Sequence, residues 1–246
     1  NTALVLREES QLGRVLDAAG GSYYIEARTD ALAREAWSRF QSLERDGGIV
    51  QLLRTGALRT RLEAAWAQRA SAIAKRKEPV LGVSEFANLR ETLPGTPRPP
   101  AGVHRDAEGF EALRARVESS NGAGVVSLFL LGPSTEHRAR AGFAEGFFAV
   151  AGLRTIAHTV YDAAHAGRDA AQVVGATADV TCICGSDERY ATEAAITARA
   201  LKAAGVKRVV LAGRPGALEA DLRAAGVDTF IYMGCDLLAT LEELDA

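Results

Sequence analysis

The second half of the chain alternates short apolar runs with amphipathic segments. Between the runs, residues 188–205 and 215–226 carry apolar side chains at the three- and four-residue spacing of a helix. The runs themselves are of strand length and cover 125–131, 153–157, 179–184, 207–212 and 228–232. Strands that alternate with helices of this length form parallel βαβ units with right-handed crossovers. The pattern therefore predicts an α/β domain with a doubly wound, five-stranded parallel sheet.

Glycine and proline mark the expected ends of these helices. Gly205 and Gly226 follow the last apolar positions, where a C′ glycine with a left-handed backbone is common. Pro215 stands at an expected first helical position. With helices on both faces of the sheet, we expect a flavodoxin-like domain over residues 119–246.

The first half of the chain predicts helices without a sheet. After residues 22–27, Thr29 is expected to cap a helix that ends at Gly47–Gly48, and a second helix is expected over 57–74. The apolar positions of the two helices, together with Trp37 as a core residue, are Leu32, Ala36, Phe40 and Leu43, then Leu58, Leu62, Trp66 and Ile73. Because these helices have no sheet of their own to pack on, residues 1–86 are interpreted as the end of a larger domain.

Residues 87–118 are expected to link the two parts. The stretch ETLPGTPRPPAG at 91–102 is rich in proline and cannot continue a helix. The chain also begins at Asn1 without a methionine and in the middle of a pattern, which predicts that sequence is missing upstream.

Composition excludes two classes of partner. A net charge of −2 and a pI near 6.2 give no basic excess for nucleic acid, since only residues 74–77 are locally basic. No apolar run approaches the roughly 20 residues of a membrane span. The N-terminus lacks the basic-then-apolar layout of a signal peptide. We expect a cytoplasmic protein that binds neither nucleic acid nor membranes.

The three cysteines do not predict a metal site. Cys182 and Cys184 are two residues apart on an expected strand, and Cys235 stands alone, so no CxxC motif is present. A zinc site needs four protein ligands, or three and a water. Buried thiols in a reducing compartment are the favoured interpretation.

The loop after the first strand, GPSTEHRARAG at 132–142, is the candidate for chemistry. In doubly wound sheets, ligands bind at the carboxyl ends of the strands near the switch point, which predicts the loops after the first and third strands. No glycine-rich phosphate motif follows either strand. His137 is either a ligand or a first-turn helix residue, with Ser134 or Thr135 as cap and Glu136 near the positive end of the dipole.

Several segments together resemble a known family. Residues 1–37 contain NTALVLREE and GSYYIEARTD, and residues 79–86 read PVLGVSEF. These segments and the last 125 or so residues are similar to the adenosylcobalamin-dependent acyl-CoA mutases, typified by methylmalonyl-CoA mutase. The resemblance implies that residues 1–86 are the C-terminal end of a TIM-type substrate barrel, and that residues 119–246 correspond to a cobalamin-binding domain.

The resemblance also implies a cofactor site, but several residues of the family's motif are replaced in this sequence. The family's D-x-H-x-x-G motif falls on 135–140, so that His137 matches the cobalt ligand, while Thr135 replaces the aspartate and Arg140 the glycine. The family's Ser-x-Leu falls on Ser186, Asp187 and Glu188, and its paired glycines fall on Gly213 and Arg214. We expect a degenerate, non-functional site at these positions, with His137 as metal ligand only if cobalamin binds. No catalytic residue is assigned.

The departures themselves resemble one subfamily. Residues 183–191, 211–216 and 231–241 look like the small, non-catalytic chain of heterodimeric bacterial methylmalonyl-CoA mutases. This implies a catalytic large subunit as partner, adenosylcobalamin bound in the complex but not by this chain, and interconversion of methylmalonyl-CoA and succinyl-CoA by the complex. Two alternatives stay open, a competent cobalamin-binding segment that uses His137, and a stand-alone regulatory module.

Overall fold

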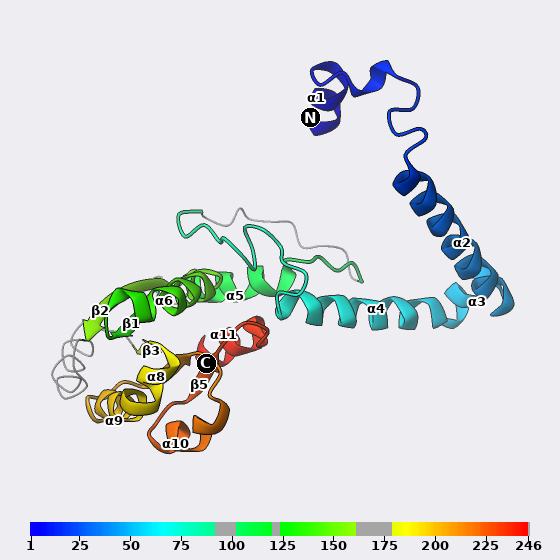
Figure 1. The fold of residues 1–246 in the computed structure, drawn as a ribbon. Coiled ribbons are helices and arrows are strands. Elements are labelled where there is room, and N and C mark those ends of the chain that lie inside the picture. The colour runs from blue at the N-terminus through cyan, green and yellow to red at the C-terminus, as the bar shows by residue number, and fades with distance from the viewer. Residues whose placement is uncertain (92–101, 120–123, 161–178, 246) are drawn as a thin grey trace. The chain divides into compact units, whose positions relative to one another are not determined.

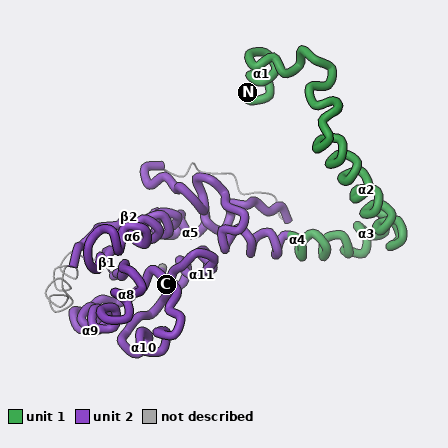
Figure 2. Tube along the Cα trace, in the orientation of Figure 1, with its two compact units in different colours: residues 1–65 green, residues 66–246 purple. Residues whose placement is uncertain are grey.

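A computed structural model of the chain describes residues 1–91, 102–119, 124–160 and 179–245. Most of the proline-rich stretch 91–102 lies outside these residues. The chain divides into two compact units, Asn1–Ala65 and Trp66–Ala246 (Figure 2). The expected division into 1–86, 87–118 and 119–246 concerns independent folding and stays a prediction.

The first unit is helical. It contains α1 (Thr2–Glu8), a 3₁₀ turn (Leu12–Arg14), α2 (Tyr23–Arg45), α3 (Gly48–Thr55) and the start of α4 (Ala57–Ala74). The bounds of α4 and the end of α2 before Gly47 agree with the sequence analysis. Among residues 1–65, all of which are described, only Leu52 is buried.

Two expectations for this unit were wrong. Thr29 does not cap α2, because the helix already begins at Tyr23, after Ser22. The aromatic and β-branched residues at 23–25 favour strands only weakly, so they do not prevent a helix there. The expected core face of α2 is also exposed, with Leu32 56% and Trp37 61% accessible. Of the positions expected on the apolar side of α4, Leu62 is exposed, Leu58 and Trp66 are half-buried, and Ile73 is buried as expected. Periodicity identified an apolar face, but nothing in this unit covers it.

The second unit contains the parallel sheet. Its strands are β1 (Val125–Leu131), β2 (Arg154–Val160), β3 (Val180–Cys184), β4 (Arg208–Ala212) and β5 (Thr229–Ile231). They lie in the order β2-β1-β3-β4-β5, and every pair is parallel. This is the flavodoxin-like order, so the expected fold class of this domain is confirmed. The interpretation of residues 1–86 as the end of a TIM-type barrel stays a prediction.

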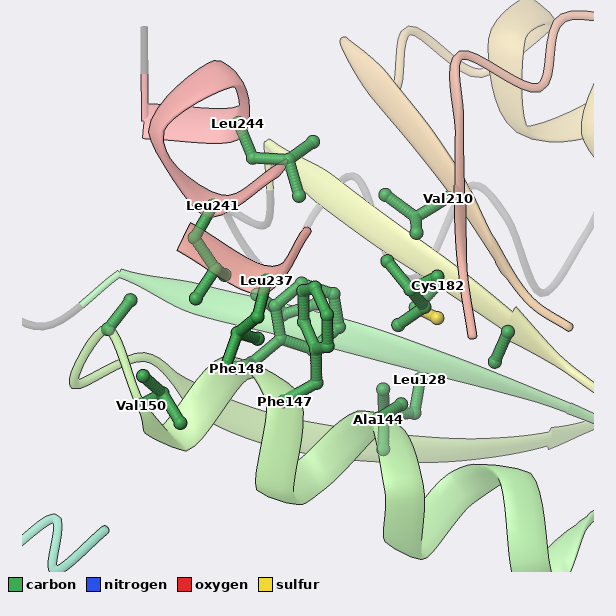
Figure 3. Close-up of a cluster of buried hydrophobic side chains, with 14 of the residues drawn as sticks. Leu128, Ala144, Phe147, Phe148, Val150, Cys182, Val210, Leu237, Leu241 and Leu244 are labelled. Carbon is green, nitrogen blue, oxygen red and sulfur yellow. The ribbon is translucent and has the colours of Figure 1, made fainter. Parts of the chain in front are cut away.

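Alternate residues of the strands enter two separate cores. Leu128 and Leu130 pack on one face with α5 (Glu108–Ser119), α6 (Ser134–Ala149) and α11 (Leu237–Asp245). Phe129 and Leu131 pack on the other face with α9 (Ala195–Ala203) and α10 (Glu219–Ala224) (Figure 1). Figure 3 shows the first core, where α6 and α11 bring their apolar side chains together over the sheet. Helix α5 lies within the expected linker and was not predicted.

Two glycines end helices on the second face as expected. Gly205 after α9 and Gly226 after α10 have φ of +93° and +104°, in the left-handed region. The expected helix over 188–205 divides into α8 (Asp187–Arg189), a π-helical turn (Tyr190–Ala194) and α9. Pro215 was expected as the first helical residue. It is instead the N-cap, one position before a 3₁₀ turn (Gly216–Leu218) that leads into α10.

The two glycines allow a matched test of backbone strain. Gly205→Ala should cost about 1 kcal/mol of unfolding free energy, because alanine is strained at positive φ although no atom lies within 4 Å of its Cβ. Gly226→Ala should cost more, since its Cβ would lie 2.7 Å from Lys202 Cγ. Lys202 is held by Asp228 at 2.7 Å and cannot move freely. Urea unfolding of both variants tests this, and equal losses would show that the clash is relieved without cost.

Candidate functional site

The candidate site lies where β1, β3 and β4 end. Gly132, Gly185 and Gly213 directly follow these strands. The strand order reverses its direction of growth between β1 and β3, which makes this edge the switch point where doubly wound sheets bind ligands. Residues 132–142, most of which belong to the start of α6, and residues 185–190 therefore meet at the expected edge.

Helix α6 begins differently from the expectation. Its first residue is Ser134 and its N-cap is Pro133, which has an extended backbone, so the prediction that Ser134 or Thr135 caps the helix was wrong. No side chain makes a capping hydrogen bond there. Glu136 lies in the first turn as expected, and its Oε2 accepts a hydrogen bond of 2.6 Å from Arg189 Nε.

His137 lies in the first turn of α6 and is buried. It is 7% exposed, and its Nδ1 has no hydrogen-bond partner among the described residues. Thr135 is exposed and makes no hydrogen bond to the imidazole. The acceptor that would orient a histidine ligand through its far nitrogen is thus missing beside His137.

Arg140 extends from α6 across the end of β3. Its Nη1 donates to the Gly185 carbonyl at 2.7 Å, and its Nη2 donates to Asp187 Oδ1 at 2.6 Å. Its Cζ lies 4.7 Å from the centroid of the Tyr190 ring. The guanidinium is therefore fixed by two hydrogen bonds and a cation–π contact.

Tyr190 lies beneath this guanidinium with its hydroxyl at the strand ends. Its oxygen accepts a hydrogen bond from the Gly185 amide at 3.0 Å. The carbonyls of Ala212 and Ile183 lie 2.7 and 3.2 Å from the hydroxyl, as acceptors for its proton. Burial raises the pKa of the Tyr190 phenol well above its ordinary value, so the group is neutral and donates.

The remaining candidate residues surround Tyr190 or turn away from it. Ser186 caps α8, because its Oγ accepts from the Arg189 amide at 3.2 Å. Gly213 faces the ring, and a Cβ there would lie 3.1 Å from Tyr190 and 3.3 Å from Arg140. Arg214 instead lies over Tyr232, with its Cζ 5.0 Å from that ring centroid. Arg140, Ser186 and Gly213 thus gather at one edge, while the guanidinium of Arg214 stacks on a different ring.

Sequence reasoning missed Tyr190, Arg189 and Gly185. One signal for Tyr190 was available in the sequence, because it begins a buried face with helical spacing that continues through Ala194, Ala198 and Leu201. An aromatic residue stands out at the start of a face made otherwise of aliphatic side chains. Arg189 bonds both Glu136 and Glu193, and these hydrogen bonds raise the pKa of its guanidinium. The pairing of Arg189 with Glu136 joins residues 53 positions apart and leaves no signal in the sequence.

An open pocket of about 470 Å³ lies beside the Arg140–Tyr190 contact. Its apolar lining includes Phe143, Ile231 and Met233, and its charged lining is Arg140, Asp187 and Arg214. The pocket lies at the ends of β4 and β5, where Ala212 and Ile231 line it, and it has mixed charge.

The described residues offer no cluster of three or more potential metal ligands. Cys182 and Cys184 are fully buried with their sulfurs 3.9 Å apart, and burial raises the pKa of the Cys182 thiol. The interpretation of these two as buried thiols is confirmed, while Cys235 is partly buried. No described helix has the length and apolar character needed to cross a bilayer.

The strand order and the helices define a doubly wound α/β domain, which a helical unit precedes in the chain. A family model described as methylmalonyl-CoA mutase matches residues 1–125. The chain therefore belongs to the methylmalonyl-CoA mutase family.

Similar proteins cover the rest of the chain as well. A methylmalonyl-CoA mutase small subunit from Streptomyces virginiae is 42% identical over 252 residues, covering 98% of this chain and 39% of that protein. A probable small subunit from Mycobacterium bovis is 44% identical, over 89% of this chain and 35% of its own length. A large subunit from Streptomyces virginiae is 37% identical over 35% of this chain. The chain thus spans about two fifths of the small subunits that it matches.

Proposed function

We propose that this chain is a segment of the small, non-catalytic subunit of a heterodimeric, adenosylcobalamin-dependent methylmalonyl-CoA mutase. Within the complex, the cofactor supplies the radical chemistry that interconverts methylmalonyl-CoA and succinyl-CoA. This chain contributes surface to the assembly and binds no corrinoid. What supports the choice of subunit is that proteins named small subunits match 98% and 89% of the chain, whereas one named a large subunit matches 35%.

One observation supports the proposal that this chain binds no cofactor. The position where the family's motif has glycine is Arg140, whose guanidinium is bonded to Gly185 and Asp187 across the end of β3. A nucleotide tail between the strand ends and α6 requires that space. The residues of this edge therefore do not fit adenosylcobalamin.

The rival function, a competent cobalamin site, depends on His137. That side chain is buried, and Thr135 supplies no acceptor for its second nitrogen. A stand-alone regulatory module is disfavoured for a different reason, because the mutase family model matches residues 1–125 and so includes the helical unit that such a module would not need.

Equilibrium dialysis against adenosylcobalamin tests the proposal. We expect the wild-type chain to retain no more corrinoid than an unrelated protein of equal concentration. The variant His137→Ala, as matched control, should give the same result, because the imidazole takes no part in binding. Dissociation constants in the micromolar range for the wild type that disappear in His137→Ala would instead establish the competent site.

A second experiment tests the partner. The complete small subunit should co-purify with the catalytic large subunit, and His137→Ala should leave the mutase activity per mole of heterodimer unchanged. A tenfold fall at normal heterodimer yield, or about 1.4 kcal/mol of activation barrier, would show that the loop takes part in catalysis.

A further inference from the structure

The ring of Tyr190 lies between two glycines at which a side chain would crowd the ring. A Cβ on Gly185 would lie 3.2 Å from ring atom Cε1, and a Cβ on Gly213 would lie 3.1 Å from ring atom Cε2. These glycines follow β3 and β4, so the ends of two neighbouring strands form the two walls around one aromatic ring. The ring is 4% exposed.

The hydroxyl of Tyr190 forms hydrogen bonds with backbone groups at the ends of β3 and β4. The Gly185 amide, the Ala212 carbonyl and the Ile183 carbonyl all lie within 3.2 Å of its oxygen. Buried backbone groups without partners are costly, and one hydroxyl that both accepts and donates serves them here. The walls and the polar end of this space thus match a planar ring with a hydroxyl.

The approach to the ring is covered and the tyrosine is held in place. The guanidinium of Arg140 covers one face of the ring, and hydrogen bonds to Gly185 and Asp187 hold the guanidinium there. The helix that carries Tyr190 widens into a π-helical turn over Tyr190–Ala194, a distortion that is frequent at functional sites. The wide turn begins at the residue that reaches the strand ends.

We infer that the switch-point edge of this domain contains a preformed site for a planar, hydroxyl-bearing aromatic ring, and that Tyr190 occupies it from within while Arg140 closes it. Tyr190 is therefore an internal ligand, and removal of its side chain opens a site of the phenol class. This inference goes beyond the proposed function and does not rest on it, because it concerns contacts within this domain alone.

The test is rescue of a truncated variant by a free phenol. In the 246-residue chain, Tyr190→Ala should lower the melting temperature, and millimolar phenol should raise it again by several degrees, since shaped cavities in proteins bind small aromatic molecules. Toluene should bind about tenfold more weakly than phenol, because it leaves the backbone groups at the strand ends unpaired. Wild type should respond to neither compound.

The matched control is Tyr232→Ala, which removes the same side chain from the open pocket at the same sheet edge. Phenol should not raise its melting temperature. If phenol stabilises both alanine variants equally, or if toluene binds Tyr190→Ala as tightly as phenol, the inference is overturned.

A second variant decides the matter if Tyr190→Ala does not fold. Tyr190→Phe keeps the ring and removes the hydroxyl, so hydrogen exchange at the Gly185 amide should accelerate at least tenfold relative to wild type. An unchanged exchange rate would mean that the hydroxyl does not hold this amide, and the inference would fail.

Discussion

Phe147→Ala is expected to lower the free energy of unfolding by about 3–5 kcal/mol, because it removes a fully buried ring and leaves a cavity. Phe147 packs edge-on against Phe148 with ring centroids 5.6 Å apart and an interplanar angle of 77°. Figure 3 shows both rings beside Leu237 of α11, so the cavity would open where α6, α11 and the sheet meet. Urea unfolding followed by circular dichroism measures the loss.

Phe86→Ala is the matched control, because the same atoms are removed from a side chain that is exposed. Its unfolding free energy should change by no more than about 0.5 kcal/mol. A comparable loss in both variants would mean that the core around Phe147 is not packed as described.

Most of the sheet could be predicted from the sequence because β1, β3, β4 and β5 are almost wholly buried, whereas β2 is buried only at Val160. The run VVSLFLL predicts β1 with the bounds that the structure gives it, since six of its seven residues are buried. A strand between two helical layers must be apolar at nearly every position, which produces a continuous signal. The glycines at 205 and 226 then fixed the helix ends through a backbone requirement that is local.

The helical unit shows the limit of the same reasoning. The spacing of Leu32, Ala36 and Phe40 correctly predicted that these side chains share one face of α2. Whether that face is buried depends on what packs against it. That information lies outside the sequence of the helix. The bounds of α4 were predicted from the sequence, while the exposure of Leu62 was not.

The candidate site was predicted in position and missed in detail. The switch-point rule placed it after β1 and β3, and the resemblance pointed to Arg140 as the residue that conflicts with a cofactor. Tyr190 was missed because its role depends on a π-helical turn and on three backbone groups from two strands. These contacts are tertiary, so no local pattern reports them.

Trypsin should cut the isolated chain within α2 at least about 100-fold faster than within α9. Cleavage follows the population of locally opened states, and a 100-fold difference corresponds to about 2.7 kcal/mol of opening free energy. Arg34 and Arg39 of α2 lie in a unit with one buried residue, whereas Lys202 of α9 follows the fully buried Leu201. Mass spectrometry of timed digests measures the two rates.

The same digest, repeated on the heterodimer, distinguishes two explanations for the exposed helical unit. The unit is either weakly packed in every state or packed only when the rest of the mutase is present. In a heterodimer of complete subunits, the α2 sites should become as resistant as the α9 site, because the exposed face with Leu32, Trp37 and Phe40 presents apolar area that assembly can bury. Equal rates at both sites in the isolated chain would contradict the prediction. Cleavage of α2 that stays fast in the heterodimer would show that this face lies outside every packed surface of the enzyme, and the proposal that the chain acts through surface would then have to rest on the α/β domain alone.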